Sequence, residues 1–365
     1  MKKTFVASAL AIAFSSTAFA GDNIDLYGRV QQEIAKPSST DAGGSFVIKD
    51  AESRFGIRGS EDLGGGMKAV FAYEFGVVTD VSSNAPLDTR HAYLGMKTAK
   101  YGTVVIGSQD GGNDSQAPLY NQAKATLGGV NSNSGSLLLI GVPGNNQLKA
   151  PVERQQRAGN AIGYALTLGD YSISARHSLQ GDNDVANNTG LNPNRFKENG
   201  IRATEAAVTW NQGPLMIGGG IGYVGRQEAQ ETNFLNDFRT LKSTYQVVAS
   251  YDFGVVKVSG LAGQNNFDGK NPINGENRNR EYSLSASAPL SANTGLFVNV
   301  SDSERNNLLF TEELRQYQVA AYYDFSRRTR AYAGFNLARS EATSPFEPNV
   351  GTYDRVYTVG MQHNF

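Results

Sequence analysis

The sequence predicts an all-β protein, a transmembrane antiparallel up-and-down β-barrel of 16 strands. Three observations point to this fold class. Side chains alternate with a period of two along much of the chain, the connections alternate between short and long, and the chain stops inside an amphipathic strand. The composition agrees, because 41 Gly, 17 Tyr and 18 Phe with only 11 Pro favour strands joined by turns.

The first residues have the features of a secretion signal. A lysine pair precedes an apolar run over residues 5–14, and AFA at residues 18–20 supplies a small-x-small cleavage pattern. We therefore expect residues 1–20 to be a cleaved signal peptide and residues 21–365 to form the barrel. An N-terminal membrane anchor fits less well, because the apolar run is far shorter than the roughly 20 residues that span a bilayer as a helix.

The bulk composition limits the protein classes that need to be considered. With 0 Cys, an exported chain has no disulfides. The mean hydropathy of -0.38 resembles that of a soluble secreted protein, but a transmembrane barrel gives the same average because each strand mixes apolar and polar residues. The formal net charge is -1, or -3 without the signal segment, and this near balance gives no sign of a nucleic-acid partner.

The strand alternation is clearest in three segments, 67–75 (MKAVFAYEF), 244–253 (TYQVVASYDF) and 316–325 (QYQVAAYYDF). In each segment aromatic and aliphatic side chains share one face, while polar or small side chains occupy most of the other. The alternative is a soluble secreted sandwich or barrel. Such a protein would turn its apolar face inward, and it would not need long polar loops gathered on one side.

The connections predict the number of strands. Seven short ones lie near 62–66, 99–102, 168–171, 211–214, 252–255, 289–294 and 324–328. Eight long polar ones lie near 37–45, 79–87, 110–156, 181–198, 228–240, 264–280, 306–312 and 341–352. Fifteen connections join sixteen strands, and turns at one rim with loops at the other are typical of an outer-membrane barrel. In lipid every backbone polar group must be paired, so the sheet has to close on itself.

The C-terminus is an amphipathic strand that ends on an aromatic residue. One face of RVYTVGMQHNF carries Tyr357, Val359, Met361, His363 and Phe365. This pattern resembles the signal by which bacterial outer-membrane barrels are recognised by the barrel assembly machinery. We expect this last strand to pair with the first one, predicted at Ile24–Val30, and so to close the barrel.

A closer resemblance rests on four segments, namely DLYGRV (25–30), SRFGIRGSEDLGGGMKAVFAYEF (53–75), DTRHAYLGMKTAKYGTVVIG (88–107) and VGMQHNF (359–365). With them the chain resembles the trimeric Gram-negative general porins, especially their beta-proteobacterial and neisserial branch. The combination of the SRFGIRG segment with the C-terminal HNF makes the resemblance specific. It covers the N-terminal third and the last strand. The middle of the chain matches in the alternation of strands and connections more than in residue identity.

The resemblance implies a homotrimer with a third extracellular loop folded into the pore. It implies a place in the cell outer membrane, in contact with lipid and lipopolysaccharide, and no cofactor. The implied function is passive diffusion of small ions and hydrophilic solutes. Two alternatives stay open: a solute-preferring channel with a binding site in the lumen, and a non-conducting structural or adhesive barrel. An enzyme is not expected, since the sequence offers no defensible catalytic set.

Strand parity places several arginines inside the barrel. With Arg29, Arg54 and Arg58 inside, their apolar neighbours fall on the lipid face. With Arg90 inside, the same rule puts Tyr93 outside. The opposite parity is disfavoured, because an arginine facing lipid at mid-depth costs about 2–4 kcal/mol.

These arginines predict the selectivity of the pore. In the resembled porins, basic residues at the positions of Arg29, Arg54 and Arg90 cluster on one pore wall, and Arg157 looks like a further member. The opposite wall is normally acidic and belongs to the third loop, which here has only Asp110 and Asp114 within residues 110–150. Arginines without acidic partners in a narrow pore favour anions, so we expect an anion preference. The alternative is that the arginines only stiffen a wet wall.

Three weaker motifs support no functional assignment. GGGIGYVG contains a G-x-G-x-x-G match, but no helix follows it, so its glycines are better explained by close packing, for example at a subunit contact. DGGND at residues 110–114 has oxygen ligands for a cation, although a loop bend explains it as well and we expect no metal. The histidines are scattered, and parity puts His91 and His363 on the outward face.

Overall fold

The computed structural model describes residues 23–39, 44–51, 53–77, 87–110, 119, 122, 157–179, 201–226, 240–268, 278–306, 311–343 and 350–365, and nearly all of them are in β-strands. The first half of the barrel contains β1 (Asn23–Ser39), β2 (Val47–Asp50), β3 (Arg54–Gly64), β4 (Met67–Val77), β5 (Leu87–Thr98), β6 (Gly102–Asp110), β7 (Arg157–Leu168) and β8 (Tyr171–Ser178). The second half contains β9 (Ile201–Gln212), β10 (Leu215–Arg226), β11 (Thr240–Asp252), β12 (Lys257–Asp268), β13 (Arg278–Pro289), β14 (Thr294–Asn306), β15 (Thr311–Asp324), β16 (Thr329–Thr343) and β17 (Val350–Asn364).

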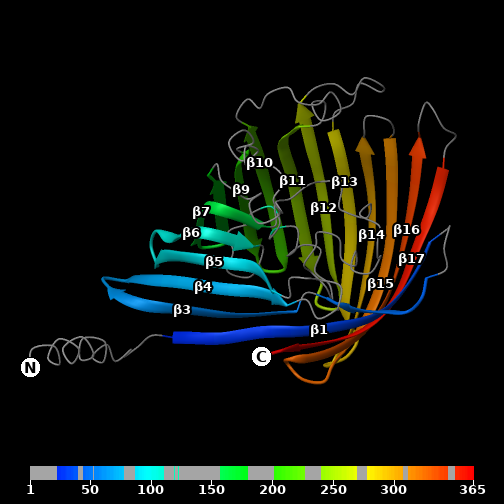
Figure 1. Ribbon diagram of the computed structural model, residues 1–365, viewed down its shortest axis with the longest axis horizontal. Helices are drawn as coiled ribbons and strands as arrows, with labels where there is room; N and C mark the ends of the chain where they lie inside the picture. The colour runs from blue at the N-terminus through cyan, green and yellow to red at the C-terminus, as the bar shows by residue number, and fades with distance from the viewer. Residues whose placement is uncertain are drawn as a thin grey trace, which may run out of the picture.

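The strands form one closed antiparallel barrel. Each strand from β3 onward pairs with the next one along the chain, and β17 returns to pair with β1 over eleven residue positions (Figure 1). The short β2 pairs with the C-terminal half of β1, while β3 pairs with its N-terminal half, so β2 and β3 share one place in the wall. The seventeen strands of the described residues therefore fill sixteen places, as the connections predicted.

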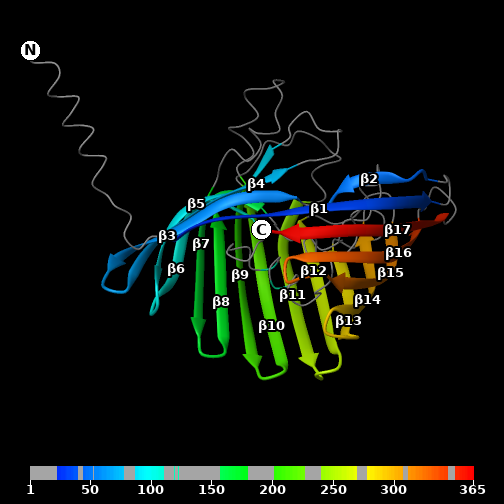
Figure 2. The ribbon, with the colours of Figure 1, turned by 90° about the horizontal axis from the view of Figure 1, so that it is seen from below.

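The barrel closes where the prediction put it. Gly28 and Phe365 exchange two backbone hydrogen bonds, with N···O distances of 3.0 and 3.1 Å, and the C-terminus lies against β1 (Figures 1 and 2). The first strand is longer than predicted, because β1 continues through the predicted loop start to Ser39 along β17. This extra length gives the seam a full ladder of hydrogen bonds and leaves no open edge there.

The alternating residues of the strands separate an apolar outside from a polar inside. Tyr245 and Val247 on β11 are 48% and 60% exposed, while Gln246 between them is 3% exposed. The predicted outward faces of the three clearest segments are confirmed in this way. A soluble sandwich would show the reverse arrangement, with a large buried apolar core. The described residues instead form three small buried apolar clusters.

Aromatic side chains mark the two edges of the apolar outer surface. Near the short turns, Tyr251 packs against Phe253 at a ring-centroid distance of 4.6 Å, and Tyr323 packs against Phe325 at 5.0 Å. Toward the opposite rim, Phe335 packs against Tyr357 at 4.9 Å. Two aromatic girdles around an apolar band are the pattern of a transmembrane barrel. No helix among the described residues is both long enough and apolar enough to cross a membrane.

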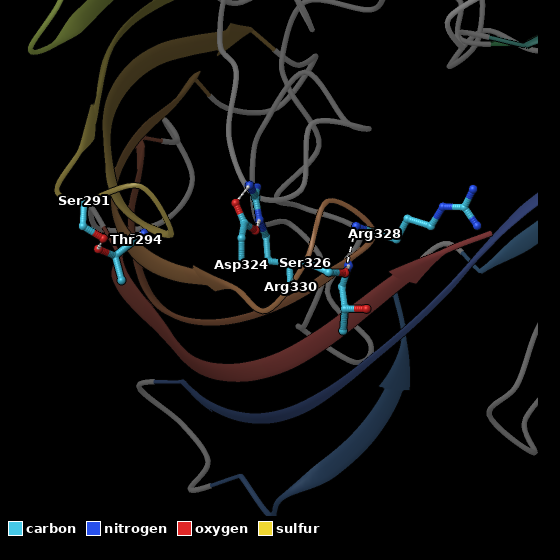
Figure 3. Close-up of polar contacts among 7 residues, drawn as sticks. Ser291, Thr294, Asp324, Ser326, Arg328 and Arg330 are labelled. Carbon is cyan, nitrogen blue, oxygen red and sulfur yellow. Dashed lines mark hydrogen bonds and ion pairs between the residues drawn. The ribbon is translucent and has the colours of Figure 1, made fainter.

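All seven predicted short turns join consecutive described strands, and Figure 2 shows those after β7, β9 and β11 at one rim. Two of them share a serine-based turn, drawn in Figure 3. Ser291 Oγ accepts hydrogen bonds from the N–H groups of Asn293 and Thr294, and Ser326 Oγ accepts them from Arg328 and Thr329. Since a side-chain oxygen replaces a backbone partner, these turns need no glycine at that point.

Candidate pore-lining site

The predicted basic residues of β1, β3 and β5 come together on the inner face of the barrel. Arg29 lies opposite Arg54 in the ladder between β1 and β3, and Asp25 lies opposite Arg58. Arg58 in turn lies opposite the inward-facing Ala72 of β4. The strand register therefore brings residues that are 61 positions apart, Arg29 and Arg90, onto one four-stranded patch, which we call the arginine wall (the lumenal side chains of β1, β3, β4 and β5).

A glutamate lies at the centre of the arginine wall. Arg90 Nε donates to Glu74 Oε1 at 2.6 Å, and Arg54 Nε lies 3.7 Å from the same oxygen. Both side chains of the Arg90–Glu74 pair are nearly buried, at 5% and 6% exposed. A charge removed from water is expensive unless it is paired and hydrogen-bonded, so this carboxylate holds two arginines in place.

A β-bulge between β4 and β5 changes which side chains reach the lumen. Glu74 lies opposite His91, and the next aligned pair is Phe75 with Thr89, so Arg90 is the extra residue. Arg90 and His91 are therefore both turned inward and buried. Tyr93 follows His91 inward, opposite Ala72. The prediction that Tyr93 and His91 face outward is wrong, because a bulge inserts one residue and reverses the parity beyond it.

The edge of the arginine wall on β1 is more exposed to water. Arg58 Nε lies 3.6 Å from Asp25 Oδ2, and its guanidinium carbon lies 4.9 Å from the centre of the Tyr27 ring. Arg29 Nε donates to Asn364 Oδ1 at 3.1 Å, which ties the wall to the last strand. Surface contacts of this kind contribute little to stability, about 0–1 kcal/mol.

Among the described residues of this patch, Arg54 and Arg90 share the carboxylate of Glu74, and Arg58 pairs with Asp25. The carboxylate that contacts Arg54 and Arg90 belongs to β4, while the side chains of the predicted loop acids Asp110 and Asp114 lie outside the description. Sequence parity already put Glu74 on the polar face of its strand, but only the register between strands shows that it lies beside Arg54 and Arg90.

The remaining predicted charges are only partly described. The backbones of Asp110 and Arg157 lie opposite each other where β6 pairs with β7, and their side chains are outside the description. Asp114 lies outside the described residues, as do the rest of the DGGND segment and the signal segment. Among the residues that the structure describes, no group of three or more His, Cys, Asp or Glu side chains is arranged to hold a metal ion.

A second buried ion pair was missed by the sequence analysis. Arg176 on β8 donates from Nη2 to Glu205 Oε2 on β9 at 3.3 Å, and its side chain is 0% exposed. The two residues are directly opposite in the ladder. The inward parity of each strand was available from the sequence, yet their pairing needs the alignment of β8 with β9 across a long loop.

The C-terminal residues take the predicted faces. Tyr357, Val359, Met361, His363 and Phe365 are all exposed on the outer surface. His363 Nδ1 lies 2.9 Å from Thr329 Oγ1 of the neighbouring strand. Phe365 covers Gly28, where a side-chain carbon would lie 2.3 Å from the Phe365 ring. The glycine of DLYGRV is thus required by the aromatic terminus that packs on it.

The glycine-rich segment GGGIGYVG lies within β10 and is paired on both sides, by β9 and by β11. It is therefore no nucleotide-binding turn, since that motif requires a strand followed by a helix. Its even-numbered glycines face inward and contact residues of the third loop. The expectation of a subunit contact is thus replaced by a contact inside the barrel for these positions.

Comparison with known proteins agrees with this geometry. The family model described as Gram-negative porin matches residues 7–343. Outer membrane porin protein 32 of Delftia acidovorans is 24% identical over 354 residues, which cover 94% of this chain and 91% of that protein. The major outer membrane protein P.IB of Neisseria gonorrhoeae is 24% identical over 353 residues, covering 91% and 92%.

Solved structures show the same fold. The anion-selective porin from Comamonas acidovorans superposes with a TM-score of 0.67 at 20% identity, covering 94% of this chain and 100% of that one. The trimer form of OmpT of Vibrio cholerae gives a TM-score of 0.64 at 14% identity, covering 94% and 99%. Since the family model spans most of the sequence and the barrel matches throughout, the chain belongs to the Gram-negative porin family.

Proposed function

We propose that this porin is an outer-membrane channel for passive diffusion of small hydrophilic solutes and ions, and that it prefers anions. The observation that carries the preference is the arginine wall, where the strand register gathers Arg29, Arg54, Arg58 and Arg90 on one stretch of the inner face. Charges that line a pore decide which ions pass. A barrel of sixteen strands leaves room for water, which supports a channel over a purely structural barrel.

The likeness to the anion-selective porin from Comamonas acidovorans adds support to this proposal. We extend it to the assembly. The protein would act as a homotrimer, in keeping with the trimer form recorded for OmpT. Residues 1–20 would be removed on export, and the barrel assembly machinery would read the C-terminal strand that ends at Phe365. Outer-membrane lipid and lipopolysaccharide would surround the aromatic girdles.

The test is single-channel recording of the purified protein in a planar bilayer under a salt gradient. We expect stepwise conductance that closes in three levels, and a reversal potential of anion sign. Arg54→Gln together with Arg90→Gln should move the reversal potential toward the cation side. Arg315→Gln is the matched control, because Arg315 pairs with Asp302 on the exposed outer face and should leave the potential unchanged. A cation-signed potential in the unmodified protein would overturn the preference, and a folded barrel without conductance would overturn the channel.

A further inference from the structure

Two tyrosines on the inner face of the barrel each lie across a glycine of the adjacent strand. Tyr27 on β1 is directly opposite Gly56 on β3. Tyr332 on β16 is directly opposite Gly360 on β17. A side-chain carbon at Gly56 would lie 2.9 Å from Tyr27 Cζ, and one at Gly360 would lie 2.4 Å from Tyr332 Cζ. Real carbon atoms do not approach so closely, so the rings fit only because these positions are glycine.

In both places the tyrosine hydroxyl reaches a glutamate on the strand beyond the glycine. Tyr332 donates a hydrogen bond to Glu33 Oε1 at 2.5 Å, and Glu33 on β1 is opposite the same glycine. Tyr27 forms a side-chain hydrogen bond with Glu74, which is opposite its glycine on β4. Each set is a row of tyrosine, glycine and glutamate across three adjacent strands, which we call a Tyr–Gly–Glu row. Strand β1 takes part in both rows, at the seam of the barrel (Figure 2).

The row that begins at Tyr332 belongs to the closure of the barrel. Its hydroxyl also accepts a hydrogen bond from Gln31 Nε2 at 2.7 Å, so the tyrosine joins β16 to β1 across the last strand. Gln31, Glu33 and Tyr332 are at most 4% exposed. Glu33 lies in the part of β1 that pairs with β2, beyond the stretch of β1 that carries Arg29.

The row that begins at Tyr27 ends within the arginine wall. Glu74 accepts the hydrogen bond of Arg90 at 2.6 Å and lies 3.7 Å from Arg54 Nε. The Tyr27 ring also contacts Arg58, whose guanidinium carbon is 4.9 Å from the ring centre. The ring is thus packed against the backbone of β3 and a guanidinium group, while its hydroxyl bonds the carboxylate. A hydrogen bond to an ionised group is roughly twice as strong as one between neutral groups, so this contact restrains the carboxylate.

We propose that Tyr27 is a positioning residue for ion selection, which acts through Gly56 and Glu74 on the arginine wall. By bonding the carboxylate, its hydroxyl holds the group that orients the guanidinium groups of Arg54 and Arg90. The bond also uses a lone pair of the carboxylate that would otherwise attract cations in the lumen. Loss of the hydroxyl should therefore loosen the arginines and expose negative charge, and both effects lower the preference for anions. This role rests on the proposed anion-preferring channel.

The role in selection is tested with Tyr27→Phe, which keeps the ring over the glycine and removes only the hydroxyl. We expect the anion-to-cation permeability ratio, measured by the reversal potential, to fall by less than the roughly fivefold effect of a full unit charge about 4 Å from an ion in water. Tyr332→Phe is the matched control, because it removes the same kind of bond from the row at the seam and should leave the ratio unchanged. An unchanged ratio in Tyr27→Phe, or an equal fall in both variants, would overturn the role in selection.

The row itself is tested without conduction, by a double-mutant cycle on the folded barrel in lipid vesicles. We expect Tyr27→Phe and Glu74→Ala together to lower the denaturant midpoint by less than the sum of their separate shifts, because the two residues share one bond. Tyr332→Phe with Glu74→Ala is the matched control and should be additive, since these residues belong to different rows. Additive shifts for the first pair would overturn the row. Coupled shifts in a barrel that prefers cations or does not conduct would support the row, but they would overturn the proposed function and with it the role in selection.

Discussion

At the scale of single residues, the proposed selectivity of this pore would depend on an acid within a basic wall. Glu74 accepts a hydrogen bond from Arg90 and lies 3.7 Å from Arg54, so it orients both guanidinium groups while reducing their net charge. Glu74 therefore keeps the two arginine side chains ordered, but it also lowers the positive potential that they produce in the lumen. An arginine without such a partner would add more positive charge but would be free to fold away from the ion path.

These two opposing effects of the Glu74 carboxylate are separated by the variant Glu74→Gln. In water, a unit charge acts on an ion about 4 Å away with about 1 kcal/mol, which corresponds to roughly a fivefold change in local ion concentration. Removing the carboxylate should therefore raise the anion-to-cation permeability ratio severalfold, as measured by the reversal potential. Glu61→Gln, on the exposed rim end of β3, should leave the ratio unchanged. A shift toward cations in Glu74→Gln would mean that the carboxylate acts mainly by keeping the arginines in the lumen.

At the scale of the strand, the alternation of facing directions determines what each position tolerates. On β15, Val319 faces lipid between the two aromatic girdles, while the adjacent Gln318 faces the lumen and is buried there. Tyr317 and Tyr323 flank this stretch on the outer face. The same chemical change at adjacent positions therefore meets hydrocarbon in one case and the polar interior in the other.

Substitution with arginine tests this difference directly. Val319→Arg should lower the free energy of unfolding of the barrel in lipid vesicles by about 2–4 kcal/mol, the cost of a charged side chain at the bilayer midplane. Gln318→Arg should cost distinctly less, because its charge enters the polar lumen. Both values come from denaturant titration of the folded protein. Equal losses for the two variants would contradict the assignment of the two faces.

The strand scale also shows what the sequence could and could not predict. Period-two alternation located the strands and turns, because lipid and lumen impose opposite chemistry on neighbouring residues. It failed at His91 and Tyr93, since one inserted residue at Arg90 reverses the parity and leaves no sign in a single strand. The partners of Glu74 and of Arg176 were missed for a related reason. Their contacts are set by the register between strands, which alternation within one strand does not encode.

The glycines of β10 illustrate the same limit. Their spacing indicated that another group packs closely against this strand, which is correct, but it did not identify that group. Leu119 and Gln122 lie more than 90 residues before Gly220 in sequence, and no local pattern connects them. Closure of the barrel is the opposite case. The aromatic C-terminal strand and the first strand were paired from the sequence alone, because a barrel in lipid has to have its two ends joined.

At the scale of the whole molecule, closure determines how the lumenal charges act together. The arginine wall lies on β1 and β3–β5, and closure of the sheet makes these strands and all the others face one lumen. Ions that cross the barrel would therefore pass the arginine wall at a distance set by the width of the lumen. The overall charge of the chain, -1 for the full sequence, matters little beside the charges that lie within a screening length of the path.

Selectivity and conductance should respond differently to salt. The Debye length is about 10 Å at 0.1 M and about 3 Å at 1 M, so the field of the arginine wall reaches across less of the lumen as salt rises. The anion-to-cation permeability ratio should therefore fall toward that of free solution when the same concentration ratio is imposed around 1 M instead of 0.1 M. Over the same range the conductance should rise in step with bulk conductivity, because the hydrogen-bonded closed barrel keeps its cross-section constant. A ratio that stays constant with salt would show that ions are selected by size or dehydration at the constriction, and the arginines would then only support the wall.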